Sequence, residues 1–221
     1  MRSLHHFILC PFSRKVRILL NEKELDCELV SEEFWEKKSK FLILNPVGQV
    51  PVLVDEGTAI IDSSAICEFL EEKYGISGLL GKTYTDKAVV RGLMAIFDQK
   101  MFHDVVKYIL SERLIKYLST SEAPNSSLIR IAKNNLIEYL NYMRRLLLKS
   151  QWLMGDIFTL ADIAAASHIS ILDYFGDMPW NYDNVVKEWY SVIKSKPSFR
   201  NILKDRIAGF TPNGIYEKLD F

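Results

Sequence analysis

Cysteine is scarce in this chain: Cys10, Cys27 and Cys67 are its only cysteines, and no two of them form a C-x-x-C pair. An odd number of widely separated cysteines argues against a disulfide framework and against a zinc site. The four histidines also lack the spacing of metal ligands. These absences predict a protein that needs no metal ion and works in a reducing compartment, which we expect to be the cytoplasm.

Net charge and long apolar runs are also missing. Lys plus Arg equals Asp plus Glu at 28 each, so no strong field favours nucleic acid or an anionic membrane. No apolar stretch reaches the length of a bilayer-spanning helix, and the run at 7–9 is too short for a secretory signal. We therefore expect neither nucleic acid nor a membrane as a partner.

The first third of the chain alternates between strand-like and helix-like patterns. Short apolar runs predict strands, and apolar residues that recur on one face predict helices between them. A turn with glycine between two of the runs predicts a hairpin. The order is a strand at 4–9, a helix at 12–22, a strand at 25–30, a weak helix at 34–42, a hairpin at 52–61 and a helix at 64–73. Residues 1–78 are therefore expected to form a small mixed sheet covered by helices.

After a connector at 76–86 the pattern is helical. Apolar residues at helical spacing predict a separate all-α unit at 87–221, with an irregular tail at 206–221. Its helices are expected at 87–118, 128–149, 160–174 and 184–194, with a short one starting at Pro197.

The clearest local pattern of the second half is a helix start. Thr159 is a favourable N-cap, and Asp162 stands three residues later, where its carboxylate can reach back to the N-cap. Phe158 and Ile163 are spaced for a hydrophobic staple around the same turn. The segment 155–166 therefore predicts a firmly capped helix.

A proline ahead of a strand is the most informative feature of the first unit. Asn45-Pro46 and Gly48 form a turn signal, and Pro51 follows directly before the strand-like run at 52–54. Because proline cannot donate to a sheet ladder, it marks the start of a strand or an edge. A cis peptide bond fits this position, and so does a rigid turn that binds no ligand.

Cys10 stands where the first predicted strand meets the first helix. Pro11 fits the first helical position, which puts Cys10 at the N-cap. The helix N-terminus, with Arg14 one turn away, predicts a lowered thiol pKa and a reactive thiolate. The alternative is a small, inert, buried cysteine. Ser13 is expected to cap the first helical turn.

The order of these motifs resembles the glutathione transferase superfamily, and the resemblance covers almost the whole chain. It rests on Cys-Pro-Phe-Ser at 10–13, the strand led by Pro51, Asp-Ser at 62–63, and the capped helix of 155–166. It implies a thioredoxin-like N-terminal domain, an all-α C-terminal domain, a cis bond before Pro51 and a two-fold dimer.

The resemblance also implies a glutathione site. The backbone of Val50, next to Pro51, would pair with glutathione as an added strand. Asp62 and Ser63 would hold the γ-glutamyl end at a helix N-terminus, although plain N-capping explains them too. The family usually has Glu or Gln in place of Asp62, which is one methylene shorter. Lys38 would be a weak contact to the glycyl carboxylate, with a solvated lysine as the alternative.

Cys10 matches the catalytic position of the cysteine-bearing, omega-like members, and Ser13 would be a secondary contact. A cysteine at this position implies a mixed disulfide with glutathione and hence thiol transfer. The leading hypothesis is therefore a glutathione S-transferase or thiol transferase. Glutathione is its co-substrate, and small apolar electrophiles or mixed disulfides are its substrates.

A second resemblance leads to a different function. Phe-Trp-Glu at 34–36 and a tail that reads Gly-Phe-x-Pro and ends in Asp-Phe resemble the alphaproteobacterial FzlA-like subgroup of the superfamily. That resemblance implies a bacterial, non-catalytic adaptor that binds the division protein FtsZ. A third option, a polymerase-associated regulator of the stringent starvation type, is disfavoured because such proteins often lack a usable thiol or glutathione site. The partner-binding residues of the adaptor would be Trp35, Phe210, Tyr216 and Phe221. The alternatives are that Trp35 is a core residue that closes the second helix, and that an ordered tail covers the active site or packs on the helical unit.

Overall fold

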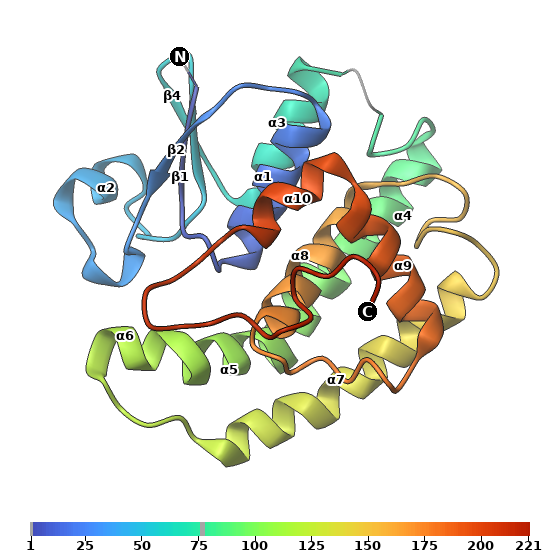
Figure 1. Ribbon diagram of the computed structural model, residues 1–221. Coiled ribbons are helices and arrows are strands. Elements are labelled where there is room, and N and C mark those ends of the chain that lie inside the picture. Colours follow the sequence, from blue (N-terminus) through green and yellow to red (C-terminus); the bar gives the residue numbers. More distant parts are fainter. Residues whose placement is uncertain (1, 76–77) are drawn as a thin grey trace.

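The computed structural model describes residues 2–75 and 78–221, so the predicted connector at 76–86 lies partly outside the described residues. The first unit is built on a four-stranded sheet of order β2-β1-β3-β4, in which β1 runs parallel to β2 and antiparallel to β3. Helices α1 and α3 lie side by side between this sheet and the helical unit (Figure 1). The elements are β1 Ser3–His6, α1 Pro11–Glu22, β2 Glu28–Ser31, η1 Phe34–Glu36, α2 Ser39–Leu44, β3 Val52–Asp55, β4 Thr58–Ile61 and α3 Ser63–Lys73. The thioredoxin-like arrangement expected from the sequence is confirmed.

The second unit is helical, as predicted. It opens with a continuous run of α and π segments, here called the helical rod. The residues that connect these segments all have right-handed helical backbone angles. Among the residues described, no helix combines the length and apolar character that crossing a bilayer demands. The rod consists of α4 Tyr84–Ala95, η2 Ile96–Val106, α5 Lys107–Leu110, η3 Ser111–Ile115 and α6 Lys116–Thr120. After it come α7 Ser126–Leu147, α8 Leu160–Tyr174, α9 Asn184–Ser195 and α10 Pro197–Leu203.

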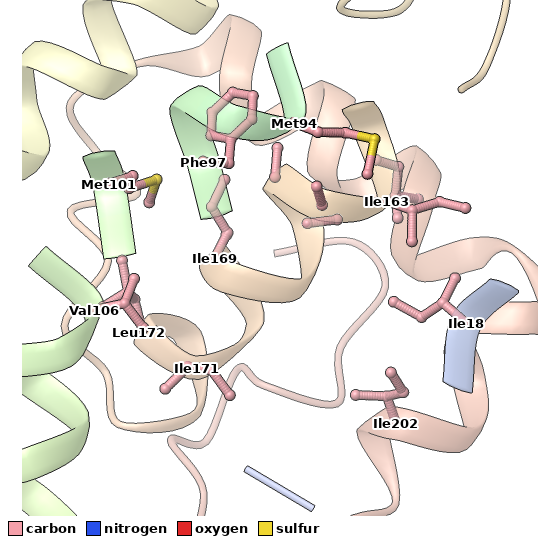
Figure 2. Packing of buried hydrophobic residues seen from close by; sticks show 14 of the residues in the cluster. Ile18, Met94, Phe97, Met101, Val106, Ile163, Ile169, Ile171, Leu172 and Ile202 are labelled. Atoms are coloured by element: carbon pink, nitrogen blue, oxygen red, sulfur yellow. The ribbon is translucent and has the colours of Figure 1, made fainter. Parts of the chain in front are cut away.

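Helix α8 forms the centre of this unit, because every one of its residues is buried. Its capping box is confirmed: the Thr159 N–H donates to the Asp162 carboxylate over 3.0 Å. Asp162 also accepts from the Trp189 indole over 3.0 Å, which fastens α8 to α9. Figure 2 shows the apolar side chains around α8, among them Ile18 of α1, Met94, Phe97 and Met101 of the rod, and Ile163, Ile169 and Leu172 of α8 itself.

Charged side chains on α1 join the two units. The guanidinium of Arg14 is fully buried and donates to Ser170 Oγ of α8 over 2.8 Å and to Asp205 over 3.2 Å. Arg17 donates from both terminal nitrogens to the two oxygens of Asp205, each over 2.9 Å. Buried charges are tolerated where each has a hydrogen-bonding partner. The Asp205 carboxylate, just after α10, therefore fixes α1 against the helical unit.

Several element boundaries differ from the predictions. The first strand ends at His6 and not at residue 9, because the chain turns there and the Cys10 N–H donates to Phe7 O. Three other differences follow from capping or from left-handed backbone. Strand β2 starts at Glu28 and not at 25, because Glu24 turns left-handed (φ 53°) and the Leu25 N–H closes the end of α1 by donating to Leu20 O. The predicted helix at 34–42 is split by Lys37, whose φ is 48°. Helix α4 begins before 87, because Thr83 and Asp86 form a capping box that the sequence reading overlooked. 

His6 gives this fold a testable pH dependence. Burial, and next the charge of Arg17, lowers the pKa of His6 from 6.5 to about 4. In the unfolded chain, His6 is protonated as the pH falls through 6.5, whereas in the native state it is protonated only near pH 4. Stability is thus complete above pH 6.5 and falls as the pH drops towards 4, by up to about 3 kcal/mol at 1.36 kcal/mol per pKa unit. Urea unfolding across this range measures it. The variant His6→Gln should flatten that slope by the share that His6 contributes, and the buried His168, whose pKa is also lowered, accounts for a further share. His103→Gln, at an exposed site, should keep the slope.

The tail after Asp205 packs on the helical unit. The Tyr216 side chain is 0% exposed, its hydroxyl donates to Ile202 O over 3.1 Å, and its ring lies 5.2 Å from that of Tyr174. The Phe221 ring covers Lys194, with 4.2 Å between the ammonium nitrogen and the ring centre. The expectation that Tyr216 contacts a partner is wrong for this structure, because its side chain is enclosed by the protein itself.

Candidate functional site

Two adjoining cavities open beside the N-terminus of α1: the first lies within the N-terminal unit, and the second lies between the two units. The first has a volume of about 180 Å³ and the second about 300 Å³. They share Phe12, Gln49 and Val50 as a common wall. The rest of the first cavity is formed by Asn45, Val47, Pro51, Ile61, Asp62 and Ser63. The rest of the second is formed by Cys10, Pro11, Phe34, Asp98, Phe102, His103 and Leu110.

Cys10 lies at the N-cap of α1 and faces the second cavity, as the sequence indicated. Its side chain is only 7% exposed, and its sulfur lies 3.9 Å from Val50 O, to which it donates. Burial raises the pKa of the Cys10 thiol, and hydrogen bonds from Ser13 offset this only in part. The expected lowering of the pKa is therefore wrong. Arg14 contributes little because its guanidinium is turned away, towards Ser170 and Asp205.

Ser13 orients the thiol and the preceding loop. It is fully buried, and its hydroxyl accepts a hydrogen bond from the Phe7 N–H over 3.3 Å. The residue does not cap the first turn of α1 in the expected way, since its hydroxyl partner lies in the loop before the helix. Its hydrogen bonds to Cys10 make it a neighbour of the thiol, in line with a secondary contact.

Four of the predicted glutathione-binding residues, Val50, Pro51, Asp62 and Ser63, line the first cavity. The Val50–Pro51 peptide bond is cis, as expected. Asp62 Oδ1 accepts from the N–H groups of Ser64 and Ala65 over 2.8 and 3.0 Å, so plain N-capping is present. Ser63, at the first position of α3, is buried and lines the cavity. The arrangement offers a helix N-terminus and a peptide edge to one small ligand.

Lys38 and Trp35 lie outside the lining of both cavities. The Lys38 ammonium is exposed and pairs with Glu36 over 2.9 Å, which matches the alternative of a solvated lysine. Trp35 is half-buried, with its ring centre 5.2 Å from those of Phe7 and Phe34. The structure thus does not bring Lys38 to the other predicted glutathione-binding residues.

Two lining features were overlooked in the sequence. Asn45 is buried, and its amide donates to Gln49 O over 2.8 Å, which shapes the loop between α2 and β3. The Asn-Pro signal predicts a turn, but it does not indicate that the Asn45 side chain lines a cavity. Asp98 lies in the middle of the helical rod, where nothing in the local pattern marks it. Its carboxylate pairs with Lys15 and, over 3.0 Å, with His168.

No metal centre is visible in the part of the chain that is described: no group of three or more His, Cys, Asp or Glu is placed to hold an ion.

Fold and site together define a glutathione S-transferase scaffold. The glutathione S-transferase N-terminal domain model matches residues 4–80, and the corresponding C-terminal domain model matches 103–206. The chain belongs to the glutathione S-transferase family.

The relatives carry two kinds of name: FtsZ-localized protein and glutathione S-transferase. FtsZ-localized protein A of Caulobacter vibrioides is 40% identical over 100% of this chain and 98% of its own length. The structure of FzlA from C. crescentus matches with a TM-score of 0.96 over 100% of this chain and 99% of that one. A glutathione S-transferase from Rhodospirillum rubrum matches with 45% identity, a TM-score of 0.97 and full coverage of both chains. Glutathione S-transferase 3 of Zea mays is 29% identical over 90% of this chain and 91% of its own.

Proposed function

We propose that this protein is an adaptor that binds FtsZ and acts in bacterial cell division. The observation that carries this proposal is the end-to-end similarity to FtsZ-localized protein A, which includes the tail. The family's C-terminal model stops at residue 206, so the tail lies outside the segment that the model matches. The raised pKa of Cys10 points the same way, because it keeps the thiol protonated at neutral pH.

The partner surface would use the aromatic residues that remain accessible. Trp35, Phe210 and Phe221 are each half-buried, so one edge of each ring can meet a partner while the protein holds the other in place. The Phe210 ring lies 5.2 Å from that of Tyr117 on α6. Rigid, half-buried aromatic rings are typical anchors of interfaces. Tyr216 would support this surface from inside.

Trp35 is expected to be an anchor of FtsZ binding. Replacing an anchor of an interface by alanine costs about 2 kcal/mol, or about 30-fold in affinity. Cosedimentation of Trp35→Ala with GTP-assembled FtsZ filaments from an alphaproteobacterium measures this loss. Tyr84→Ala is the matched control, because Tyr84 is 94% exposed and lies on α4. A folded wild-type protein that does not sediment with the filaments would overturn the proposal.

A second function is favoured by the first cavity, which gathers Val50, Pro51, Asp62 and Ser63. We propose that it binds glutathione, with the second cavity open to a small apolar electrophile or a mixed disulfide. Cys10 would then act mainly as a protonated hydrogen-bond donor to the glutathione sulfur, since burial raises its pKa. A cytoplasmic homodimer fits both proposed functions.

Glutathione binding is expected to depend on Ser63. The buried hydroxyl lines the first cavity, and losing one hydrogen bond to a charged carboxylate costs about 1.5–3 kcal/mol. Calorimetric titration to millimolar glutathione should therefore show saturable binding that weakens at least about tenfold in Ser63→Ala. Ser126→Ala, at the same helical position of α7, is the control. Equal affinity in wild type and Ser63→Ala would contradict this role, and no binding would leave the adaptor function alone.

A further inference from the structure

The second cavity is apolar except at a few positions. Its walls carry the rings of Phe12, Phe34 and Phe102, and the ring centres of Phe12 and Phe102 lie 4.7 Å apart. Among the described residues that line it, Asp98 is the one carboxylate. A cavity of about 300 Å³ with aromatic walls has the size and surface of a site for a small aromatic molecule.

Two buried side chains hold the Asp98 carboxylate. One oxygen pairs with the Lys15 ammonium, and the other lies 3.0 Å from His168 Nε2. The Lys15 ammonium is itself anchored by Ser64 Oγ over 3.2 Å. Neither Lys15 nor His168 is part of the cavity wall. These contacts fix both the position and the rotation of the carboxylate.

The same contacts keep the carboxylate charged. Burial raises the pKa of Asp98, but the charge of Lys15 and the hydrogen bond from His168 lower it more, and the net effect is a lowered pKa. His168 stays neutral, because burial lowers its own pKa. Asp98 and Lys15 therefore form an ion pair, and Asp98 is the member of the pair that lines the cavity.

An ionised carboxylate accepts hydrogen bonds and donates none, and it has about four lone-pair directions. The contacts from Lys15 and His168 use one on each oxygen, which leaves acceptor capacity for the cavity. A purely apolar occupant would strip water from these oxygens without replacing its hydrogen bonds. An anionic occupant would meet like charge.

We propose that Asp98 makes the second cavity selective for small aromatic molecules that carry a neutral hydrogen-bond donor, such as a phenol hydroxyl. Molecules with the donor methylated, or replaced by a carboxylate, are discriminated against. The inference concerns the second cavity alone and does not rest on FtsZ binding. For the proposed transferase function, it names the class of molecule that would lie beside Cys10.

Three probes that share one ring system test this selectivity. Binding of 2-naphthol, 2-methoxynaphthalene and 2-naphthoate to the full chain is measured at neutral pH by fluorescence titration, without glutathione or FtsZ. We expect 2-naphthol to bind at least about tenfold tighter than the methyl ether, the effect of one hydrogen bond to a charged group. The carboxylate should bind most weakly. Equal affinities for the three probes, or no binding of any of them, would overturn the proposal, whatever the fate of the two functions above.

Two variants separate selectivity from general packing. Asp98→Asn removes the charge at nearly constant shape, so the preference for naphthol over the ether and the penalty on naphthoate should both shrink severalfold. Leu110→Trp fills the cavity from its apolar wall and should weaken all three probes without changing their order. An unchanged order of affinities in a folded Asp98→Asn protein would contradict the proposal. If Asp98→Asn does not fold, the affinities of the wild-type protein for the three probes still test the proposal.

Discussion

Replacing Asp205 with alanine is expected to lower the free energy of unfolding by about 3–5 kcal/mol, the typical cost of removing one partner of a buried ion pair. Its carboxylate accepts three hydrogen bonds, one from Arg14 and two from Arg17. Without it, two guanidinium groups stay at the junction of the units with no carboxylate to balance them. Urea unfolding followed by tryptophan fluorescence measures the loss.

The matched control is another forked arginine–carboxylate pair. Arg91 donates to Glu68 over 2.7 and 2.9 Å, but this pair lies at the surface. Surface ion pairs contribute little because solvent screens them, so Glu68→Ala should leave stability nearly unchanged. A similar effect for both variants would show that burial of Asp205 does not matter as argued.

The second large effect is expected at Tyr216, where alanine should cost about 3–5 kcal/mol, as for other large buried aromatic residues. The side chain is fully buried, its hydroxyl bonds to Ile202 O, and its ring lies 5.9 Å from the Arg14 guanidinium carbon. Calorimetric or urea unfolding of Tyr216→Ala measures this. Tyr216→Phe keeps the ring and loses one hydrogen bond, so it should cost about 1 kcal/mol.

This prediction changes how the tail should be tested. A deletion of 212–221, the obvious test of a partner site in the tail, also removes the buried Tyr216. Lost FtsZ binding after that deletion would report on folding as much as on contact. Single substitutions at Phe210 and Phe221, which keep one edge accessible, are the cleaner experiment. A Tyr216→Ala protein as stable as wild type would restore the value of the deletion.

Local signals in the sequence predicted much of the fold. The capping box at Thr159 and Asp162, and the hairpin turn at Gly57, depend on neighbours within a few residues, and the structure has both. The boundaries that moved, at Glu24 and Lys37, involve left-handed backbone at residues that carry no glycine-like signal. Such positions are set by the packing of the chain after them, which a local pattern does not contain.

For the candidate site, too, the sequence predicted the features that depend on neighbouring residues and not those that depend on distant packing. The positions of Cys10 and Ser63 at helix N-termini could be read from flanking residues, since Pro11 and Asp62 mark those helix starts. The pKa of Cys10 could not, because it is decided by burial at the wall of the second cavity. The role of Asp98 could not be predicted from the sequence either, because its partner Lys15 lies 83 positions away in the chain.

The contacts of α1 with Asp205 also set a limit on domain exchange. Arg14 and Arg17 belong to the thioredoxin-like unit, while the carboxylate that balances them belongs to the helical one. A chimera that joins this α/β unit to a helical domain without an acidic residue at the position of Asp205 would inherit the charges without the counter-charge. Family models describe the two units separately, but in this chain their charges depend on each other. A hybrid that folds would need an acidic residue in its helical domain opposite Arg14 and Arg17.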